Sequence, residues 1–508
     1  MADTTTGEPT KAELYEQAKE QDIQGRSTMS RGELERALAE RGATEQLPGP
    51  ESGDPEPGTV SRYQAFEALA RARAAGAVVL LPRQLTGEAR RQHVRQTIRE
   101  DHAQRIKLQS EDAQAKFDKL DGSLYSFFRG TCLLFYRDLA GEDAWMPTVL
   151  ALGDVHPENY GVMPSADNVP IFGVNDFDEA AYAPFTWDLK RGAVGFMLAA
   201  EEEGGHGPKK QAKIVRHFVR GYIEGMSKFE SDGGEMDQQI RFDNAPKLIQ
   251  DLIEDCLKDR KKWLSKKYHD EYKRGFRADD EIIPLTSRRD EFQAIVDRFV
   301  RESVHQVPPR AGAMKVKDVA IRRGAGTASL GLARYYLMME GVKADATDDF
   351  VIEFKQARLS ALAGLVPPSD FAVDGQGERI AHAHGVQLVR GDVFYGHVEF
   401  EGRSFMSRER APYRGDIDLD DLSMSQWKDY ARICGSSLAH AHALSDEVGE
   451  LDHDIEPEIL KAMTPYELFI DDIVRFAHEA SDNYRSDHHA FQADHRLGAF
   501  RTTDTIHR

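Results

Sequence analysis

Two short segments of the sequence each carry an apolar strand into an acidic turn. The first is LGDVHPENYG at residues 152–161, and the second is IFGVNDFDEA at residues 171–180. Between them they supply five candidate site residues: Asp154, His156, Asn159, Asp176 and Asp178. Carboxylate and amide oxygens are the ligands that hard divalent cations prefer, and no cysteine stands nearby to favour zinc. The two turns therefore predict a site for Mg²⁺ or Mn²⁺.

A glycine-rich segment, RRGAGTASLG at residues 322–331, stands between two segments that read as strands. Glycines permit a tight loop whose main-chain N–H groups can approach phosphates. A dinucleotide-binding turn needs a glycine at the sixth position of its motif and a helix after it. Here Ser329 holds that position and ARYYLMME reads as a strand, which favours a nucleotide-covering loop between two strands. The candidate phosphate contacts are Gly324, Gly326, Thr327, Ser329 and Gly331.

A lysine lies near the end of the next strand, in VIEFKQA at residues 351–357. Lys355 has two interpretations: a contact to phosphate, or an exposed lysine on an edge strand. The glycine-rich segment just upstream favours the phosphate contact, because both features then serve one ligand.

The GD-x-H-x-x-N turn followed by a DFD turn resembles the catalytic and metal-binding loops of protein-kinase-like phosphotransferases, above all those of aminoglycoside and choline kinases. The resemblance implies that Asp154 orients or deprotonates the acceptor hydroxyl while His156 braces the loop. It also implies that Asn159 and Asp176 hold Mg²⁺ against the nucleotide phosphates. Asp178 would support these ligands or bind a second ion.

The same resemblance extends to residues outside the two turns. Lys355 resembles the strand lysine that pairs with nucleotide phosphates, and Glu378, before a short helical segment, is the candidate for its helix carboxylate partner. Asp188, in FTWDLKR, would anchor the catalytic loop from the helix that follows. Arg129, in the FFRG turn, is either a contact to phosphate or acceptor or the partner of a loop carboxylate.

The order of these motifs differs from that of ordinary kinases, in which the glycine loop and the lysine precede the catalytic loop. Here both acidic turns come first. SSLAHAHALS at residues 436–445, which resembles the helix leading into a catalytic loop, lies near the C-terminus. We therefore expect an α+β, two-lobed, protein-kinase-like fold that is circularly permuted. Spatial adjacency makes a site, so the chemistry survives permutation.

The combined motifs also resemble a bacterial family, domain of unknown function 2252. The matching segments, which together cover most of the chain, are SFFRG, GDVHPENYG, NDFDEA, WDLKR, the glycine-rich segment, FKQA and CGSSLAHAHA. The family pattern has a glutamate after the lysine, whereas this chain has Gln356. The family name implies no substrate.

Composition and motifs together predict a division of the chain into six parts. These are a disordered tail at 1–9, a helical module at 10–42, a flexible acidic Pro/Gly linker at 43–60, a catalytic-lobe segment at 61–310, a β-rich nucleotide lobe at 311–410 and a helical catalytic-lobe segment at 411–508.

The segment 10–42 carries two apolar helical stripes, one with Leu14 and Ala18 and one with Leu34 and Leu38. It resembles the helix–extended–helix modules of the SAP or Rho N-terminal type, which bind nucleic acid. Its acidic and basic side chains nearly balance, so the electrostatic footprint of a nucleic-acid contact is missing. A docking or spacer role is favoured.

The charge balance narrows the classes of partner. The chain has 66 Lys and Arg against 86 Asp and Glu, a formal net charge of −20. This argues against coating nucleic acid or an anionic membrane. The three widely spaced cysteines predict neither a disulfide framework nor a metal motif. Without a signal-like segment or a membrane-length apolar run, a cytoplasmic location is favoured.

The leading hypothesis is an ATP- and Mg²⁺-dependent phosphotransferase acting on the hydroxyl group of an unknown small molecule or protein. Nucleotidyl (AMP) transfer by the same fold and a nucleotide-binding pseudokinase or scaffold are the alternatives, followed by a nucleic-acid-associated factor that acts through residues 10–42. A metal-dependent hydrolase site near the C-terminus is conceivable, although helix packing is the favoured role of its residues: Asp487, His488, Asp494 and His495.

Overall fold

A computed structural model describes most of the chain. The described residues are 11–20, 31, 34, 38, 62–77, 80–108, 111–302, 307–323, 332–366, 376–447, 451 and 453–501. The chain divides into two compact units, Met1–Gln64 and Ala65–Arg508.

The N-terminal unit contains helix α1 (Lys11–Glu20). Leu14, Ala18 and Leu34 are buried together, and Leu38 packs against them, so the two predicted apolar stripes meet. The rest of the predicted module at 10–42 lies outside the described residues, as do the predicted tail and linker. Its SAP or Rho N-terminal type therefore stays a prediction.

The second unit begins with helices. These are α3 (Arg62–Ala74, whose first turn lies before the division), α4 (Gly87–Asp101), α5 (Ala103–Leu108), α6 (Glu111–Gly122), α7 (Leu124–Gly130) and α8 (Cys132–Leu139). Ser123 caps α7, since its hydroxyl accepts a hydrogen bond from Ser126 N at 3.0 Å.

Two small antiparallel sheets carry the acidic turns. β1 (Thr148–Ala151) pairs with β4 (Ala181–Pro184), and β2 (Tyr160–Pro164) pairs with β3 (Pro170–Val174). The first acidic turn joins β1 to β2 and includes the 3₁₀ turn η2 (Pro157–Asn159). The second follows β3 and leads into β4. Each acidic turn therefore begins where a short strand ends, the first after β1 and the second after β3.

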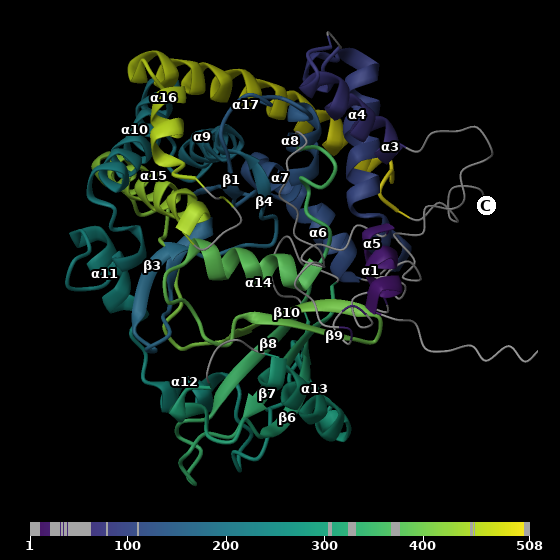
Figure 1. Cartoon of the computed structure of the whole chain (residues 1–508), viewed down its shortest axis with the longest axis vertical. Coiled ribbons are helices and arrows are strands. Elements are labelled where there is room, and N and C mark those ends of the chain that lie inside the picture. Colours follow the sequence, from purple (N-terminus) through teal and green to yellow (C-terminus); the bar gives the residue numbers. More distant parts are fainter. Residues whose placement is uncertain are drawn as a thin grey trace, which may run out of the picture. The chain divides into compact units, whose positions relative to one another are not determined.

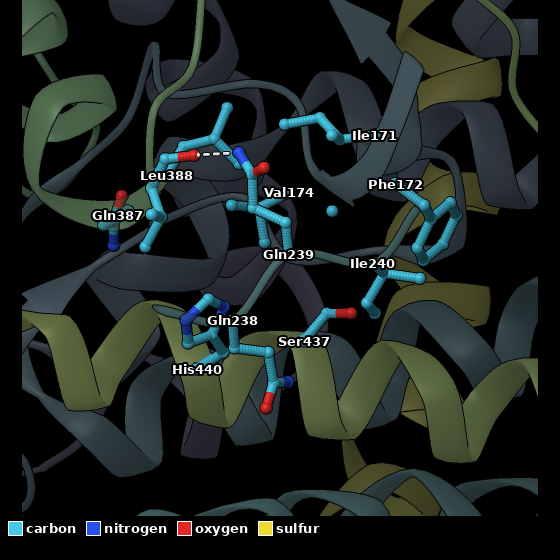
Figure 2. A pocket seen from close by; sticks show the side chains of 12 residues that line it. Ile171, Phe172, Val174, Gln238, Gln239, Ile240, Gln387, Leu388, Ser437 and His440 are labelled. Carbon is cyan, nitrogen blue, oxygen red and sulfur yellow. Dashed lines mark hydrogen bonds between the residues drawn. The ribbon is translucent and has the colours of Figure 1, made fainter. Parts of the chain in front are cut away.

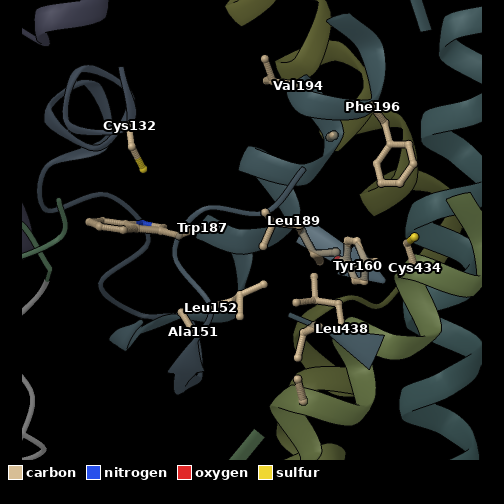
Figure 3. Close-up of a cluster of buried hydrophobic side chains, with 14 of the residues drawn as sticks. Cys132, Ala151, Leu152, Tyr160, Trp187, Leu189, Val194, Phe196, Cys434 and Leu438 are labelled. Carbon is tan, nitrogen blue, oxygen red and sulfur yellow. The ribbon is translucent and has the colours of Figure 1, made fainter. Parts of the chain in front are cut away.

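Four long helices and the short α16 enclose these strands: α9 (Phe185–Glu202), α10 (Pro208–Asp232), α15 (Met424–Glu447), α16 (Glu456–Ala462) and α17 (Tyr466–Arg496). Figure 3 shows side chains from α9, β1 and α15 meeting in one apolar core. Glycines let α10 and α15 approach closely. A Cβ at Gly435 would lie 2.0 Å from Phe218 O, and one at Gly221 would lie 2.1 Å from Arg432 O.

A six-stranded antiparallel sheet forms the β-rich part of this unit (Figure 1). Its strands, in spatial order, are β5 (Ile282–Pro284), β6 (Val316–Arg322), β7 (Arg334–Met339), β8 (Phe350–Gln356), β10 (Arg403–Glu409) and β9 (Gly396–Phe400). The segment predicted to be β-rich, 311–410, thus contains five of the six strands, including the predicted strands at ARYYLMME and around Lys355. β5 lies outside the predicted segment 311–410, so the β-rich part begins earlier than the sequence suggested.

Helices cover this sheet and connect it to the rest of the unit. α13 (Arg289–Glu302) packs one face with Phe292 and Val296 against Leu337 and Phe354. α14 (Gln376–Gln387) contacts β9, β10 and α15, and so lies between the sheet and the helices (Figure 1). The remaining elements are α11 (Lys247–Cys256), α12 (Arg260–Lys267) and the 3₁₀ turns η1 (Pro82–Gln84), η3 (Glu235–Asp237), η4 (Thr286–Arg288) and η5 (Pro309–Ala311).

The predicted α+β fold class is confirmed by this combination of helices and antiparallel sheets. Cys132, Cys256 and Cys434 are buried free thiols. Within the described part of the chain, none of the helices has the length and apolarity that a bilayer crossing requires.

Candidate active-site cleft

The acidic turns and one face of the six-stranded sheet line a single open cleft of about 450 Å³. The lining is strongly charged on both sides. Its acidic and amide groups are Asp154, Glu158, Asn159, Asn175, Asp176 and Asp416, and its basic groups are Arg129, Arg322, Arg334, Lys355, Arg408, Arg410 and Arg414.

Asp154 lies just beyond β1, and one arginine holds its carboxylate. Arg191 of α9 donates to Asp154 Oδ1 from Nε at 3.0 Å and from Nη2 at 2.8 Å. The guanidinium is fully buried and lies 3.6 Å from the ring centroid of Phe128. Burial lowers the pKa of Arg191, but the Asp154 carboxylate, together with the nearby Cys132, Tyr484 and Tyr136, outweighs burial, and the net shift is upward. A permanently charged group therefore fixes the position of Asp154.

His156 is buried two residues after Asp154. Burial, followed by the charges of Arg129 and Arg191, lowers the pKa of His156 well below its usual value, so the imidazole is neutral. Its Nε2 lies 3.8 Å from Asp154 Oδ2. A Cβ at Gly195 of α9 would lie 3.0 Å from His156 Cβ, which shows how closely the histidine packs on that helix. This packing suits a bracing residue.

Asp188 of α9 holds the end of β1. Its two carboxylate oxygens accept hydrogen bonds from Leu152 N at 2.6 Å and from Gly153 N at 3.0 Å. On its other side, Asp188 lies 3.0 Å from His442 Nε2, and His442 Nδ1 lies 2.8 Å from the hydroxyl of Tyr222. A buried network from α10 and α15 thus positions the strand end from which Asp154 projects.

Asn159 ties the two acidic turns together. Its Nδ2 donates to Asp154 O at 2.6 Å, and its main-chain oxygen accepts from Asn175 N at 3.1 Å. Asn175 Nδ2 in turn donates to Asp416 Oδ1 at 3.1 Å. The sequence-predicted residues of both turns therefore form one connected unit at the cleft.

Lys355 joins the sheet to the second acidic turn. Its Nζ donates to Asp178 Oδ2, although 177 residues separate the two in sequence. Burial and then Asp178 raise the pKa of Asp176. Burial would also raise the pKa of Asp178, but the charge and hydrogen bond of Lys355, together with Arg408 and Arg379, outweigh burial and lower it. The exposed-edge interpretation of Lys355 is wrong, because β8 is an inner strand and Lys355 is buried.

The predicted partner of Lys355 is also wrong. Glu378 is exposed in the first turn of α14. Asp178 is instead the carboxylate that pairs with Lys355, the role that we expected of Glu378. The neighbouring Arg379 is the buried residue of that turn, and it donates to Asp178 O and Ala180 O at 2.7 Å each. α14 therefore supports the acidic turn through the positively charged Arg379, whereas the sequence analysis had expected a carboxylate from this helix.

The donor set of the second turn fits a divalent cation. Asp154, Asp176 and Asp178 line a small pocket of about 20 Å³. Asp178 Oδ1 is buried and has no hydrogen-bond partner among the described residues, so this oxygen is available to a ligand. Asn159, Asp176 and Asp178 are the residues that could hold Mg²⁺ there.

The carboxylates at this cleft do not by themselves form a complete cage. Among the described residues, the group of three cysteine, histidine or carboxylate ligands at metal-binding spacing is Asp446, Asp454 and Glu456, away from the cleft. A cation at the second turn would need the Asn159 amide, water or ligand oxygens to complete its coordination, as Mg²⁺ sites commonly do.

From residue 324 onward, the glycine-rich segment lies in a part of the chain that the structure does not describe. Gly324, Gly326, Thr327, Ser329 and Gly331 all lie outside the described residues. The flanking strands are described and pair as β6 and β7, with Arg322 and Arg334 at the cleft. The two strands that were predicted on either side of the glycine-rich segment are therefore observed.

Arg129 was predicted either to contact phosphate or acceptor or to pair with a loop carboxylate, and its position is compatible with both. It lies in the last turn of α7, where its Nη1 is 2.6 Å from Glu158 Oε2 in the first acidic turn. It also lines the cleft. The salt bridge to a loop carboxylate is therefore present, and the guanidinium remains next to the space that a ligand would fill.

A buried glutamate and a set of arginines were missed by the sequence analysis. Glu353 of β8 is fully buried, with Oε2 2.6 Å from Arg408 Nε and Oε1 2.9 Å from Arg334 Nη1. Burial would raise the pKa of Glu353, but Arg408, Arg334 and Arg410 lower it well below its usual value. The signal was in SRERAPYRGD at residues 407–416, where one arginine lies near the end of β10 and two follow that strand.

The C-terminal acidic and histidine residues pack helices. Asp487 lies 2.6 Å from Arg90 Nη2, and Asp494 lies 2.6 Å from Arg91 Nη2. His488 Nε2 lies 2.9 Å from Leu120 O. These partners come from α4 and α6, so the packing interpretation is confirmed over a metal-dependent hydrolase site.

A second, small pocket of about 20 Å³ lies between β3, the segment after η3, α14 and α15 (Figure 2). Gln239 Nε2 donates to Val389 O at 2.5 Å across it. Its size corresponds to about one water molecule, and it is separate from the acidic turns.

Comparison with known families decides where the chain belongs. The family described as "uncharacterized protein conserved in bacteria (DUF2252)" matches residues 108–494, more than half of the chain. The chain belongs to the DUF2252 family. The matched region includes both acidic turns, the six-stranded sheet and the cleft between them, whereas the N-terminal unit lies outside the match. Neither curated proteins nor solved structures yield a match.

Proposed function

We propose that this DUF2252 protein is an ATP- and Mg²⁺-dependent phosphotransferase that acts on a hydroxyl acceptor. The observation that carries the proposal is the meeting of Lys355 with Asp178, beside Asp154 and Asp176, in one cleft. These residues come from two distant segments of the chain. In kinase-like enzymes, a lysine and an acidic pair of this kind hold the phosphates and the metal.

Each residue at the cleft has a role that its contacts support. Asp154, whose position Arg191 fixes, orients the acceptor hydroxyl or accepts its proton. Lys355 and the segment between β6 and β7 hold the nucleotide phosphates. Asn159, Asp176 and Asp178 bind Mg²⁺, which neutralises charge on the transferring phosphoryl group. Neutral His156 braces the turn and takes no proton.

The order of these elements supports a circularly permuted, kinase-like arrangement. The strands on either side of the glycine-rich segment, followed by the lysine strand, come after the acidic turns in sequence but line the same cleft. α15, which contains SSLAHAHALS, supports β1 through His442 and Asp188. Function depends on this spatial meeting rather than on sequence order.

The test is ATP turnover by the full chain with Mg²⁺, with water and a panel of hydroxyl compounds as acceptors. We expect Asp154→Asn and Asp176→Asn to lower turnover by about two orders of magnitude or more. Asp290→Asn, on an exposed helix surface, is the matched control and keeps wild-type turnover. Equal turnover in all four proteins would contradict the proposal.

Nucleotidyl transfer is the second candidate, and the positions of the basic side chains in the cleft support it. Basic groups extend from Lys355 to Arg410 and Arg414, so a triphosphate could lie along the cleft in either direction. Product labelling separates the two reactions. Label from γ-labelled ATP on the acceptor indicates phosphoryl transfer, whereas label from α-labelled ATP indicates AMP transfer.

A further inference from the structure

The sheet face that lines the cleft carries an unusual excess of positive charge. Directly paired residues of antiparallel strands project to the same face. Arg334 of β7 pairs with Lys355 of β8, and Glu353 of β8 pairs with Arg408 of β10. Like charges directly opposite each other destabilise a sheet, so the Arg334–Lys355 row needs a compensating anion.

Carboxylates of the chain compensate this row but leave the arginines after it in excess. Glu353 neutralises two arginines at short range, Arg408 and Arg334. Its nearest approach to a third, Arg410, is 4.0 Å. Lys355 is paired with Asp178. One fully buried carboxylate thus faces three guanidinium groups.

Two arginines beyond the end of β10 keep free hydrogen-bonding capacity. Arg410 Nε is buried and has no hydrogen-bond partner among the described residues. The Arg414 guanidinium has neither a hydrogen bond nor an ion pair with any residue that the structure describes. Burial, and then the charges of Arg408 and Arg410, lower the pKa of Arg414 to about 10. A bound anion would relieve this repulsion.

The same surface offers little to an apolar ring. Among the described residues that line the cleft, Val162 and Tyr336 are the apolar and phenolic ones, and Lys355 and arginines occupy the rest of the sheet side. Burying an unpaired guanidinium against a neutral ring costs free energy, whereas phosphate oxygens satisfy it with paired hydrogen bonds. The chemistry on this side of the cleft therefore selects anions.

We propose that Arg408, Arg410 and Arg414 form an anion subsite distinct from Lys355, so that the cleft recognises its ligand by a chain of phosphates rather than by a base. The ligand class is a linear polyphosphate, either free or as the phosphate chain of a nucleoside triphosphate. The inference rests on the proposed function only in taking ATP as one of the ligands.

Calorimetric titration of the full chain in Mg²⁺ tests the ligand class. The titrants are inorganic tripolyphosphate, ATP, AMP and adenosine. We expect tripolyphosphate and ATP to bind within about tenfold of each other, AMP to bind at least about tenfold more weakly, and adenosine to show no binding. Affinity for adenosine or AMP equal to that for ATP would overturn the inference. ATP binding without any tripolyphosphate binding would overturn it too.

The variant Arg414→Gln tests the subsite itself. We expect about tenfold or greater loss of tripolyphosphate affinity, since a charge-assisted contact is removed. The ligand-free variant should melt at a higher temperature than wild type, because the repulsion from Arg408 and Arg410 is gone. Arg289→Gln, on the exposed face of α13, is the control and changes neither quantity. Unchanged tripolyphosphate affinity in Arg414→Gln would refute the subsite.

The outcomes separate this inference from the proposed function. If tripolyphosphate binds and Arg414→Gln weakens it while no ATP is turned over, the subsite stands and the phosphotransferase proposal fails. If ATP is turned over in an Asp154-dependent way but affinity does not depend on the number of phosphates, the phosphotransferase stands and the subsite fails.

Discussion

At the scale of single residues, the cleft depends on charges that other charges hold in place. Arg191 fixes Asp154, Arg379 supports the main chain of the second turn, and Glu353 holds Arg334 and Arg408. Each contact is buried or nearly so, which strengthens it and makes the loss of one partner costly. The positions of the charged groups in the cleft are therefore set by the residues that pair with them as much as by the acidic turns themselves.

Replacing Glu353 by Gln should weaken the fold and strengthen anion binding. The change leaves Arg334 and Arg408 without their buried carboxylate, so we expect the free energy of unfolding to fall by about 3–5 kcal/mol. Urea unfolding measures this loss. Added tripolyphosphate should raise the melting temperature of the variant by more than that of wild type. Glu340→Gln, at an exposed pair with Lys315, is the control; a loss as small as in this control would contradict the role of Glu353.

At the scale of secondary-structure elements, two packed helices set the geometry behind the acidic turns. α10 and α15 approach so closely that Gly221 and Gly435 have no space for a side chain. α15 also carries His442, which meets Asp188 under the end of β1. The close packing of the helices is thus transmitted to the strand end before Asp154.

Gly435→Ala should separate these helices. Its Cβ would meet the main-chain oxygen of Phe218 at 2.0 Å, so we expect destabilisation of about 1–3 kcal/mol or more, read from the unfolding midpoint. ATP turnover should fall as well, because the support of β1 shifts. Gly385→Ala in α14 meets no atom within 4 Å and should gain up to about 1 kcal/mol from helix propensity. Equal stability of the two variants would contradict this account.

At the scale of the whole second unit, the Lys355–Asp178 pair connects the sheet to the acidic turns. Because Lys355 lowers the pKa of Asp178, this pairing stabilises the fold above the pKa of an unfolded aspartate, about 4, and the stabilisation is lost as pH falls through the lower folded value. The pair therefore contributes at neutral pH and fails in acid.

A double-mutant cycle with Lys355→Met and Asp178→Asn measures that connection. We expect a coupling energy of about 0.5–3 kcal/mol at neutral pH that disappears in acid, since Asp178 is then protonated. Unfolding midpoints of the four proteins between neutral and acid pH provide the measurement. Zero coupling at neutral pH would show that the pair does not join the two segments in solution.

Much of the fold and part of the site could be predicted from local patterns. Strand alternation and charged helical periodicity predicted the helices and the strands around Lys355, and the two acidic turns predicted their own carboxylates. Arg191, Glu353 and Arg414 were missed because an isolated arginine or glutamate has no local signature, and Glu378 was chosen because it stood just before an expected helical segment.

The sequence by itself determined which segments around Lys355 are strands, which turns carry carboxylates, and that the chain is α+β, since these properties follow from periodicity and residue type over a few neighbours. Only the tertiary structure decided that Asp178 pairs with Lys355, that Arg379 replaces a carboxylate partner, and that arginines fill the sheet side of the cleft. Those contacts join residues far apart in the chain, and burial and charge act through space rather than along the sequence.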